Sequence, residues 1–187
     1  MNRRDAVQHL ALLLGGSLVG ANAFLTGCKT KTGKDQSRDA DDIAYLDEIA
    51  ETILPATSTP GAKAAKVGQF MTVMVNDCYE EKDQKVFREG MDKLNDAADK
   101  KYNSKFMKLS PQQRHDLLVQ LDKEQKDYTK NKKKDDPAHY FRMMKELTML
   151  GYFTSEIGTK VARRYVPVPG RFDGCIPYKK GDKAFAP

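Results

Sequence analysis

The sequence predicts an all-α protein, a small bundle of five or six helices that ends in an extended, Pro-rich C-terminal arm. Two observations carry this prediction. Apolar residues recur at intervals of three to four along most of the chain after residue 40, which is the period of an amphipathic helix. No segment alternates apolar and polar residues over enough positions to require a β-strand.

The first two expected helices are separated by a turn-forming segment. One helix is expected from Asp41, where acidic side chains suit a helix N-terminus, to Leu54, because Pro55 cannot continue it. The Thr-Ser-Thr-Pro-Gly sequence at 57–61 then predicts a turn. A second helix follows, and its apolar face consists of Val67, Phe70, Met71, Met74, Val75 and Cys78.

A third helix is expected over about Asp83–Tyr102, before a clear signal for a fourth. Ser110 suits the N-cap of that helix, Pro111 its first position, and Gln113 completes a capping box. This combination predicts a helix start at residue 111.

Two more helix starts are expected towards the end of the bundle. Asp136 and Pro137 repeat the cap-then-proline pattern and predict that a helix opens there. Thr154 or Ser155 is a candidate cap for a last short helix that runs through Ala162.

Residues 1–27 have the three parts of a secretory signal: a basic start, an apolar run of about 16 residues and a small-residue cleavage site. The run is shorter than the roughly 20 residues that a spanning helix needs. Arg3 and Arg4 favour the twin-arginine route, which carries folded proteins. The Leu-Thr-Gly-Cys sequence that ends at Cys28 resembles a bacterial lipobox. We therefore expect a lipid on Cys28 and a location on the periplasmic side of the cell envelope.

The expected organisation is a signal peptide at 1–27, a flexible tether at 28–39, a helical domain at 40–165 and an arm at 166–187. Removing the signal leaves 160 residues, the size of one domain, with 30 Lys and Arg against 25 Asp and Glu. An ordinary solvent-exposed surface accounts for these interspersed basic and acidic residues. A nucleic-acid interface would concentrate basic residues on one face, so no nucleic-acid partner is expected.

Two cysteines remain after the signal, Cys78 and Cys175. Outside the cytoplasm two thiols can pair, so an internal disulfide is the first hypothesis. The alternative is that Cys175 bonds to a partner chain while Cys78 is a small buried apolar residue.

The C-terminal arm combines prolines, which exclude helix, with apolar and aromatic anchors, so it must lie against its own bundle or another protein. Its candidate partner-binding residues are Pro169, Arg171, Phe172, Cys175, Ile176 and Tyr178.

Catalytic motifs are missing from the sequence. There is no Gly-x-Gly-x-x-Gly turn for a flavin or nicotinamide and no Cys-x-x-Cys-His for a covalent haem. His115 and His139 each lack a second ligand at helical spacing, so capping or solvent-facing roles are expected and no metal site. Asp47, Glu48 and Glu51 share one side of the first helix, which predicts its solvated face. No catalytic residue and no cofactor are expected in this chain.

Several segments together resemble the gluconate 2-dehydrogenase small-subunit family, known as subunit 3. The resemblance covers roughly residues 40–178, and residues 100–136 match least well. It is carried by Ile53-Leu54-Pro55-Ala56-Thr57, Thr59-Pro60-Gly61-Ala62, Phe70-Met71, Asn76-Asp77-Cys78-Tyr79, Gly151-Tyr152-Phe153-Thr154-Ser155-Glu156-Ile157-Gly158 and Tyr165-x-Pro167-x-Pro169-Gly170-Arg171-Phe172-Asp173-Gly174-Cys175.

The resemblance implies a non-catalytic partner of a larger dehydrogenase of the glucose–methanol–choline oxidoreductase type. In such complexes the large subunit holds FAD and oxidises a sugar, sugar acid or polyol, and a cytochrome c subunit often accepts the electrons. The small subunit helps the flavoprotein to mature and supplies the export signal. The competing hypotheses are a free-standing, lipid-anchored helical binding module of the cell envelope and, with least support, an enzyme in its own right.

Overall fold

The computed structural model describes residues 33–168, 170 and 174–186. The chain divides into two units, residues 1–38 and residues 39–187, and the fold described below is that of the second unit. Six residues singled out from the sequence lie outside the described part, and their predicted roles stay predictions: Arg3, Arg4, Cys28, Pro169, Arg171 and Phe172.

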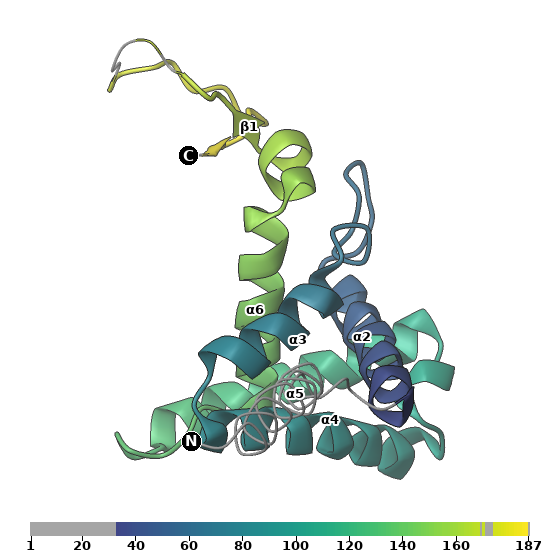
Figure 1. Ribbon diagram of the computed structural model, residues 1–187. Helices are drawn as coiled ribbons and strands as arrows, with labels where there is room; N and C mark the ends of the chain where they lie inside the picture. Colours follow the sequence, from purple (N-terminus) through teal and green to yellow (C-terminus); the bar gives the residue numbers. More distant parts are fainter. Residues whose placement is uncertain (1–32, 169, 171–173, 187) are drawn as a thin grey trace, which may run out of the picture. The chain divides into compact units, whose positions relative to one another are not determined.

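The described residues are mostly helical, which confirms an all-α bundle (Figure 1). In chain order the helices and strands are α2 (Gly33–Ile53), α3 (Val67–Cys78), α4 (Glu81–Tyr102), the 3₁₀ turn η1 (Phe106–Lys108), α5 (Pro111–Asn131), α6 (Tyr140–Thr154), the π-helical turn η2 (Ile157–Ala162), β1 (Arg164–Tyr165) and β2 (Phe185–Ala186).

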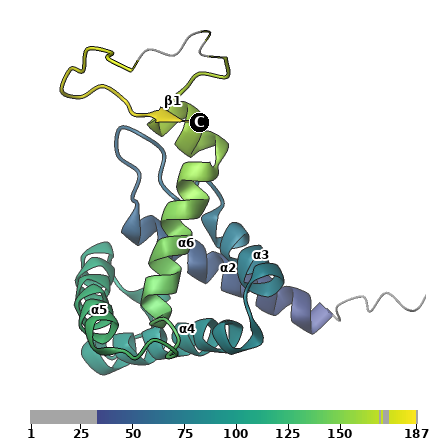
Figure 2. The same cartoon turned by 90° about the vertical axis from the view of Figure 1, so that its left-hand side faces the viewer.

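Helix α6 is the central element of the bundle. It contacts α3, α4, α5 and η2, and Figure 2 shows it between α5 on one side and α2 and α3 on the other. Its buried residues are Phe141, Met143, Met144, Leu147, Thr148, Gly151 and Tyr152. A helix that is buried on several sides must be apolar around most of its circumference, which this sequence provides.

The contact between α3 and α6 is close enough to require a glycine. A Cβ atom built on Gly151 would lie 2.6 Å from the Phe70 ring, a distance that side-chain carbons do not adopt. Phe70 therefore packs directly on the α6 backbone. Both residues belong to segments that carry the family resemblance, and this packing explains why they occur together.

One core residue, Phe106, comes from a short turn and not from a long helix, so helical periodicity does not predict it. Phe106 lies in the short turn η1, yet it is completely buried and packs edge-to-face on Tyr45 of α2, with ring centroids 5.7 Å apart. Its backbone N–H donates to Asn95 Oδ1 of α4. A short irregular segment thus fills the space between α2 and α4.

The start of α5 follows the sequence prediction. Ser110 is the N-cap, Pro111 is at the first helical position, and Ser110 Oγ accepts a hydrogen bond from the Gln113 N–H. Gln113 Oε1 in turn accepts from the Ser110 N–H at 3.0 Å, which completes the capping box. Local sequence was sufficient here because every group involved lies within four residues.

The start of α6 differs from the prediction. Helix α6 begins at Tyr140, not after Asp136, because Asp136 caps a turn instead: its carboxylate accepts from the Lys133 N–H at 2.9 Å. The actual cap is His139, whose Nδ1 accepts from the Phe141 N–H at 3.2 Å. The capping role expected for a histidine is therefore confirmed at His139.

The starts of α2 and η2 also differ from expectation. Helix α2 begins at Gly33 and not near Asp41, since no further Gly or Pro interrupts the sequence before Pro55. After α6, Ser155 Oγ accepts a hydrogen bond from the Gly158 N–H at 3.0 Å, but the N-cap position of η2 is Glu156, one residue beyond the predicted candidates Thr154 and Ser155.

The C-terminal arm closes on itself, which the sequence analysis did not anticipate. Strands β1 and β2 pair in parallel, with Arg164 opposite Phe185 and Tyr165 opposite Ala186. The connecting residues, 166–184, are called the C-terminal loop below. The chain thus returns to the base from which this loop leaves the bundle.

The capping box at α5 supports a prediction about stability. We expect Ser110→Ala to lower the free energy of unfolding by about 1 kcal/mol, because the Gln113 N–H loses its acceptor. For a domain of this size, the melting temperature should fall by about 2–4 °C. Thermal unfolding followed by circular dichroism measures the shift. Ser58→Ala, at an exposed position of the α2–α3 loop, is the matched control and should leave the melting temperature unchanged.

Candidate functional site

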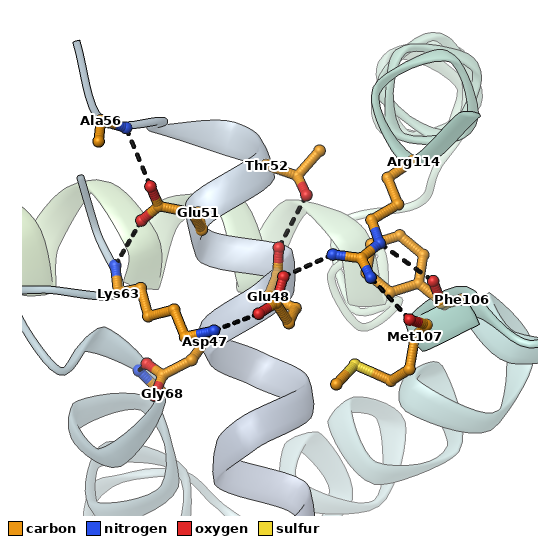
Figure 3. Close-up of polar contacts among 10 residues, drawn as sticks. All are labelled: Asp47, Glu48, Glu51, Thr52, Ala56, Lys63, Gly68, Phe106, Met107 and Arg114. Atoms are coloured by element: carbon orange, nitrogen blue, oxygen red, sulfur yellow. Dashed lines mark hydrogen bonds and ion pairs between the residues drawn. The ribbon is translucent and has the colours of Figure 1, made fainter. Parts of the chain in front are cut away.

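The candidate site is built around the α2–α3 loop (residues 54–66), which contains the first segments of the family resemblance. Three carboxylates from the last turns of α2 hold this loop and the start of α3 in place: Asp47, Glu48 and Glu51 (Figure 3). Each of these residues is partly buried. The prediction that they form the solvated face of α2 was therefore wrong, because the loop folds back over them.

Asp47 caps helix α3 from another helix. The residue before α3, Lys66, has a left-handed backbone conformation and supplies no side-chain cap. Instead, the Gly68 N–H donates to Asp47 Oδ1 at 2.7 Å. A carboxylate at a helix N-terminus satisfies a free amide and interacts favourably with the helix dipole. Asp47 thereby fixes where α3 starts relative to α2.

Glu48 lies between two cations. It pairs with Lys63 of the α2–α3 loop and with Arg114 of α5, as Figure 3 shows. The Glu48 and Arg114 side chains are only 19% and 15% exposed. Arg114 also donates to the backbone carbonyls of Phe106 and Met107, at 3.2 and 2.7 Å, so its planar guanidinium joins α2, η1 and α5.

Glu51 accepts hydrogen bonds from two backbone amides of the loop. The Ala56 N–H donates to one carboxylate oxygen at 2.9 Å, and the Lys63 N–H donates to the other at 2.8 Å. A Cβ atom on Gly61 would lie 2.3 Å from this carboxylate, so the loop can approach Glu51 only with glycine at that position. The carboxylate replaces the backbone partners that a helix or a sheet would have supplied.

Tyr152 of α6 joins the second half of the family resemblance to the first. Its hydroxyl donates to the Pro60 carbonyl at 2.7 Å, across 92 residues of sequence. The side chain is buried and packs edge-to-face on Phe153. The α2–α3 loop is therefore held from both sides, by α2 through Glu51 and by α6 through Tyr152.

The pKa values of the neighbouring carboxylates Asp47 and Glu48 are shifted in opposite directions. The hydrogen bond from Lys63 lowers the pKa of Glu48 against the effect of burial, and the charge of Arg114 lowers it further. Burial raises the pKa of Asp47, and the hydrogen bond from Gly68 only partly offsets it. Glu48 is the group whose charge stabilises the fold, since its charged form is the one that its surroundings favour.

All three carboxylates thus accept hydrogen bonds from the fold that they support, and within the described residues none is paired with a histidine for proton transfer. What the arrangement does is present a rigid turn at the surface. Residues 55–58 of the turn are exposed, although both of its ends are held by hydrogen bonds. An ordered, exposed turn is suited to contact with another protein, because little conformational freedom is lost on binding.

The second exposed feature is the C-terminal loop. Two residues predicted to bind a partner lie there with little protein around them: Ile176 is 53% exposed and Tyr178 is 76% exposed. Val168 and Phe185 of the same region are also exposed. Four exposed apolar side chains thus lie between residues 168 and 185, the segment in which partner-binding residues were predicted.

The two cysteines are both at the surface. Cys78 is exposed at the end of α3, with its Sγ 4.0 Å from the Met74 sulfur, so the alternative that it is a buried apolar residue was wrong. It lines a surface hollow of about 600 Å³ together with Glu80, Asp83 and Asp136. Cys175 is exposed in the C-terminal loop. Its bond to Cys78 or to a partner chain stays a prediction.

The described residues contain no group of three His, Cys, Asp or Glu side chains that could hold a metal ion. His115 is exposed on α5, 3.6 Å from Asp116, and takes part in neither loop. None of the helices in the described part is long and apolar enough to cross a membrane.

Comparison with known families gives one match. The family described as "Gluconate 2-dehydrogenase subunit 3" matches residues 40–170, which include α3 to η2 and most of α2. No curated protein and no solved structure matches the chain.

The Glu48 pairs support a prediction about pH. Because the folded-state pKa of Glu48 is lowered, its stabilising contribution is present above the unfolded pKa, near 4.5, and is lost as the pH falls through the folded value. We expect Glu48→Gln to lower the free energy of unfolding by about 2 kcal/mol at pH 7. The difference from the wild type should shrink below about pH 4.

Urea unfolding at a series of pH values measures this difference. Asp96→Asn is the control, since it removes an exposed carboxylate of α4 that has no salt bridge in the described structure. A Glu48→Gln protein as stable as wild type at pH 7 would show that the Lys63 and Arg114 pairs do not support the loop.

Proposed function

The chain belongs to the gluconate 2-dehydrogenase subunit 3 family, and we propose that it is the accessory subunit that a larger, flavin-dependent dehydrogenase needs for maturation, export and membrane attachment. Membership of the family implies a complex with a larger dehydrogenase subunit. The proposal goes further by giving this chain no catalytic role and by assigning FAD to the partner, a dehydrogenase of the glucose–methanol–choline type. A cytochrome c subunit is the proposed electron acceptor.

The observation that carries the proposal is the way in which the family's segments are used. They build a held, exposed turn on a helical scaffold, and the chain beyond the family match closes the exposed C-terminal loop. The carboxylates nearest to the turn are occupied by backbone amides and by Lys63 and Arg114, which supports a structural role. These features favour a chain that binds another protein over one that transforms a substrate.

The proposed export role follows from the chemistry of the partner. A flavoprotein must fold around FAD in the cytoplasm, so it requires a route that carries folded proteins. Residues 3–4 of this chain, an Arg pair, would supply the signal for that route. A partner without its own signal would cross the membrane only if it is already bound, which requires an interface well above about 1,000 Å². A lipid on Cys28 would then hold the complex at the periplasmic face.

Export gives the first test. We expect Arg3→Lys with Arg4→Lys to retain both this chain and the larger dehydrogenase in the cytoplasm, because the paired guanidinium groups are what the route recognises. Cell fractionation with immunoblotting of both chains measures the distribution. Lys29→Arg with Lys31→Arg, just beyond the signal, is the matched control. A dehydrogenase that reaches the periplasm in cells carrying the Arg3 and Arg4 changes would rule out the escort role.

The interface gives the second test. Replacing Ile176 and Tyr178 by Ser should weaken the complex at least tenfold, because exposed apolar anchors commonly carry much of the binding energy. Co-purification with the tagged dehydrogenase, followed by titration, measures the affinity. Replacing Met107 and Val119 by Ser, both 42% exposed on the helical body, is the control and should leave binding unchanged. A wild-type chain that purifies alone would favour the free-standing binding module instead.

A further inference from the structure

We propose that residues 174–184 of the C-terminal loop dock on an acidic surface of the larger dehydrogenase subunit, through the apolar side chains of Ile176 and Tyr178 and the adjacent Lys179 and Lys180. This inference rests on the proposed function and adds the chemistry of the surface that the partner must offer. It is carried by the distribution of charge, the exposure of the cations, and the way in which the loop is held.

The net positive charge of the chain after the signal arises at its C-terminal end. Residues 28–159 hold 23 basic and 23 acidic residues, so the helical body and its tether are neutral. Residues 160–187 hold seven basic residues and two acidic ones. The net charge of the chain after the signal therefore arises from the C-terminal loop and its base. The basic residues of the base and the loop together are Lys160, Arg163, Arg164, Arg171, Lys179, Lys180 and Lys183.

Most of these cations are not neutralised by the fold. Lys160 pairs with Glu156 on η2. Within the described residues, no carboxylate forms a salt bridge with Arg163, Arg164 or the three lysines at 179, 180 and 183. All three of those lysines are exposed. Elsewhere in the described chain, by contrast, salt bridges are frequent on α4, α5 and α6. Lysines that form no salt bridge in the part that the structure describes, such as Lys100 and Lys123, also occur on the helical body, but only the C-terminal segment has basic residues in clear excess over acidic ones.

The base of the loop is held by several contacts. The Arg164 N–H donates to the Ala184 carbonyl at 2.8 Å, and the Arg164 guanidinium lies 4.6 Å from the centre of the Phe185 ring. Arg163 donates to the Phe153 carbonyl at the end of α6, and Lys183 donates to the Val161 carbonyl. These contacts connect both ends of the loop to η2 and α6.

The outer part of the loop contains a closed turn that brings an aromatic ring and two cations together. The Asp182 N–H donates to the Lys179 carbonyl at 3.0 Å, and the Lys179 N–H donates to the Asp182 carboxylate at 2.9 Å. Tyr178 immediately precedes this turn, and Lys180 is at its second position. A turn that is already closed loses little conformational freedom on binding, so its contacts contribute more to affinity.

The arrangement matches the anatomy of a protein interface. Aromatic and aliphatic anchors occupy the centre of such an interface, and charges at the rim steer the partners together. Ile176 and Tyr178 supply the anchors, and Lys179 and Lys180 supply the adjacent charge. Since the body of the chain and its tether together have no net charge, the excess of basic residues in the loop favours a partner surface that is negative.

An anionic membrane surface offers the same charge, but the backbone of the loop favours a protein. Segments that lie in a lipid interface are typically amphipathic helices, whose amides are paired internally. Residues 174–184 contain no helix, so most of their backbone groups have no partner within a regular element. A folded protein surface can pair with such groups, whereas the lipid interior cannot.

The test measures how fast the two subunits associate. The full chain, in detergent, is immobilised, and binding of the purified dehydrogenase is followed at about 50 and 300 mM NaCl, which changes the screening of exposed charges. We expect the association rate constant to fall about tenfold at the higher salt concentration. Lys179→Glu with Lys180→Glu should lower it about tenfold at 50 mM and remove most of the salt dependence, with little change in dissociation rate.

The control variant is Lys100→Glu with Lys123→Glu. It makes the same change in net charge at exposed positions of α4 and α5, and it should leave the association rate unchanged. Circular dichroism should show the same helix content for both variants, because all four lysines are exposed.

Three results would overturn the inference, and they differ in what they leave standing. Tight association that responds neither to salt nor to the changes at Lys179 and Lys180 removes the acidic docking surface but keeps the accessory role. No association of the wild-type chain at any salt concentration removes the proposed function as well. Binding to phosphatidylglycerol vesicles that the Lys179 and Lys180 changes abolish, with subunit association unaffected, assigns the loop to the membrane.

Discussion

The bond between the Asp47 carboxylate and the Gly68 N–H is the constraint on which much of the remaining arrangement depends. It sets the start of α3 against α2 at a helix end that has no cap of its own. Once α3 is placed, Phe70 can pack on the backbone of α6 at Gly151. Helix α6 then carries Tyr152 to the Pro60 carbonyl and, through η2 and β1, carries the C-terminal loop. A hydrogen bond to a charged group is typically worth about 1.5–3 kcal/mol, and this one is partly buried.

What the sequence could predict was determined by how far apart the interacting groups lie along the chain. The capping box at Ser110 was predictable because its partners are three residues apart. The same local rule failed at Asp136, because its carboxylate accepts a hydrogen bond from the Lys133 N–H in a turn and does not cap a helix. Asp47, Glu48 and Glu51 were misread as a solvated face because their partners lie up to 66 residues away, beyond any local pattern.

The C-terminal segment shows the same limit in another form. Its prolines and anchors indicated correctly that it is not helical. Its closure depends on two-residue strands, which are too short to produce an alternating pattern. Resemblance to a family reached further than periodicity did, because it identified the α2–α3 loop and the Gly151–Tyr152 segment, which the structure then brings together. The contacts between these segments give a physical reason for residues that would otherwise be only a motif.

Scaffold and contact surface occupy different parts of this chain. The helical body and its tether together have equal numbers of basic and acidic residues, and the body buries most of its aromatic residues fully or in part and uses acidic groups to hold backbone amides. The exposed turn at 55–58 and the C-terminal loop carry the side chains that the body does not use. Such a division allows the loop to change with its partner while the bundle stays the same, since substitutions at exposed positions usually alter stability little.

The position of α6 also determines where the protein can be labelled without disturbing that surface. The α5–α6 connection, with Lys133 and Lys134 exposed, lies at the first end of the helix, and the C-terminal loop follows its other end. A 15-residue helix is about 22 Å long, so a fluorophore attached at Lys133 would remain remote from the docking residues. A tag fused after β2 would instead emerge beside the buried Ala186 and obstruct the very loop under observation.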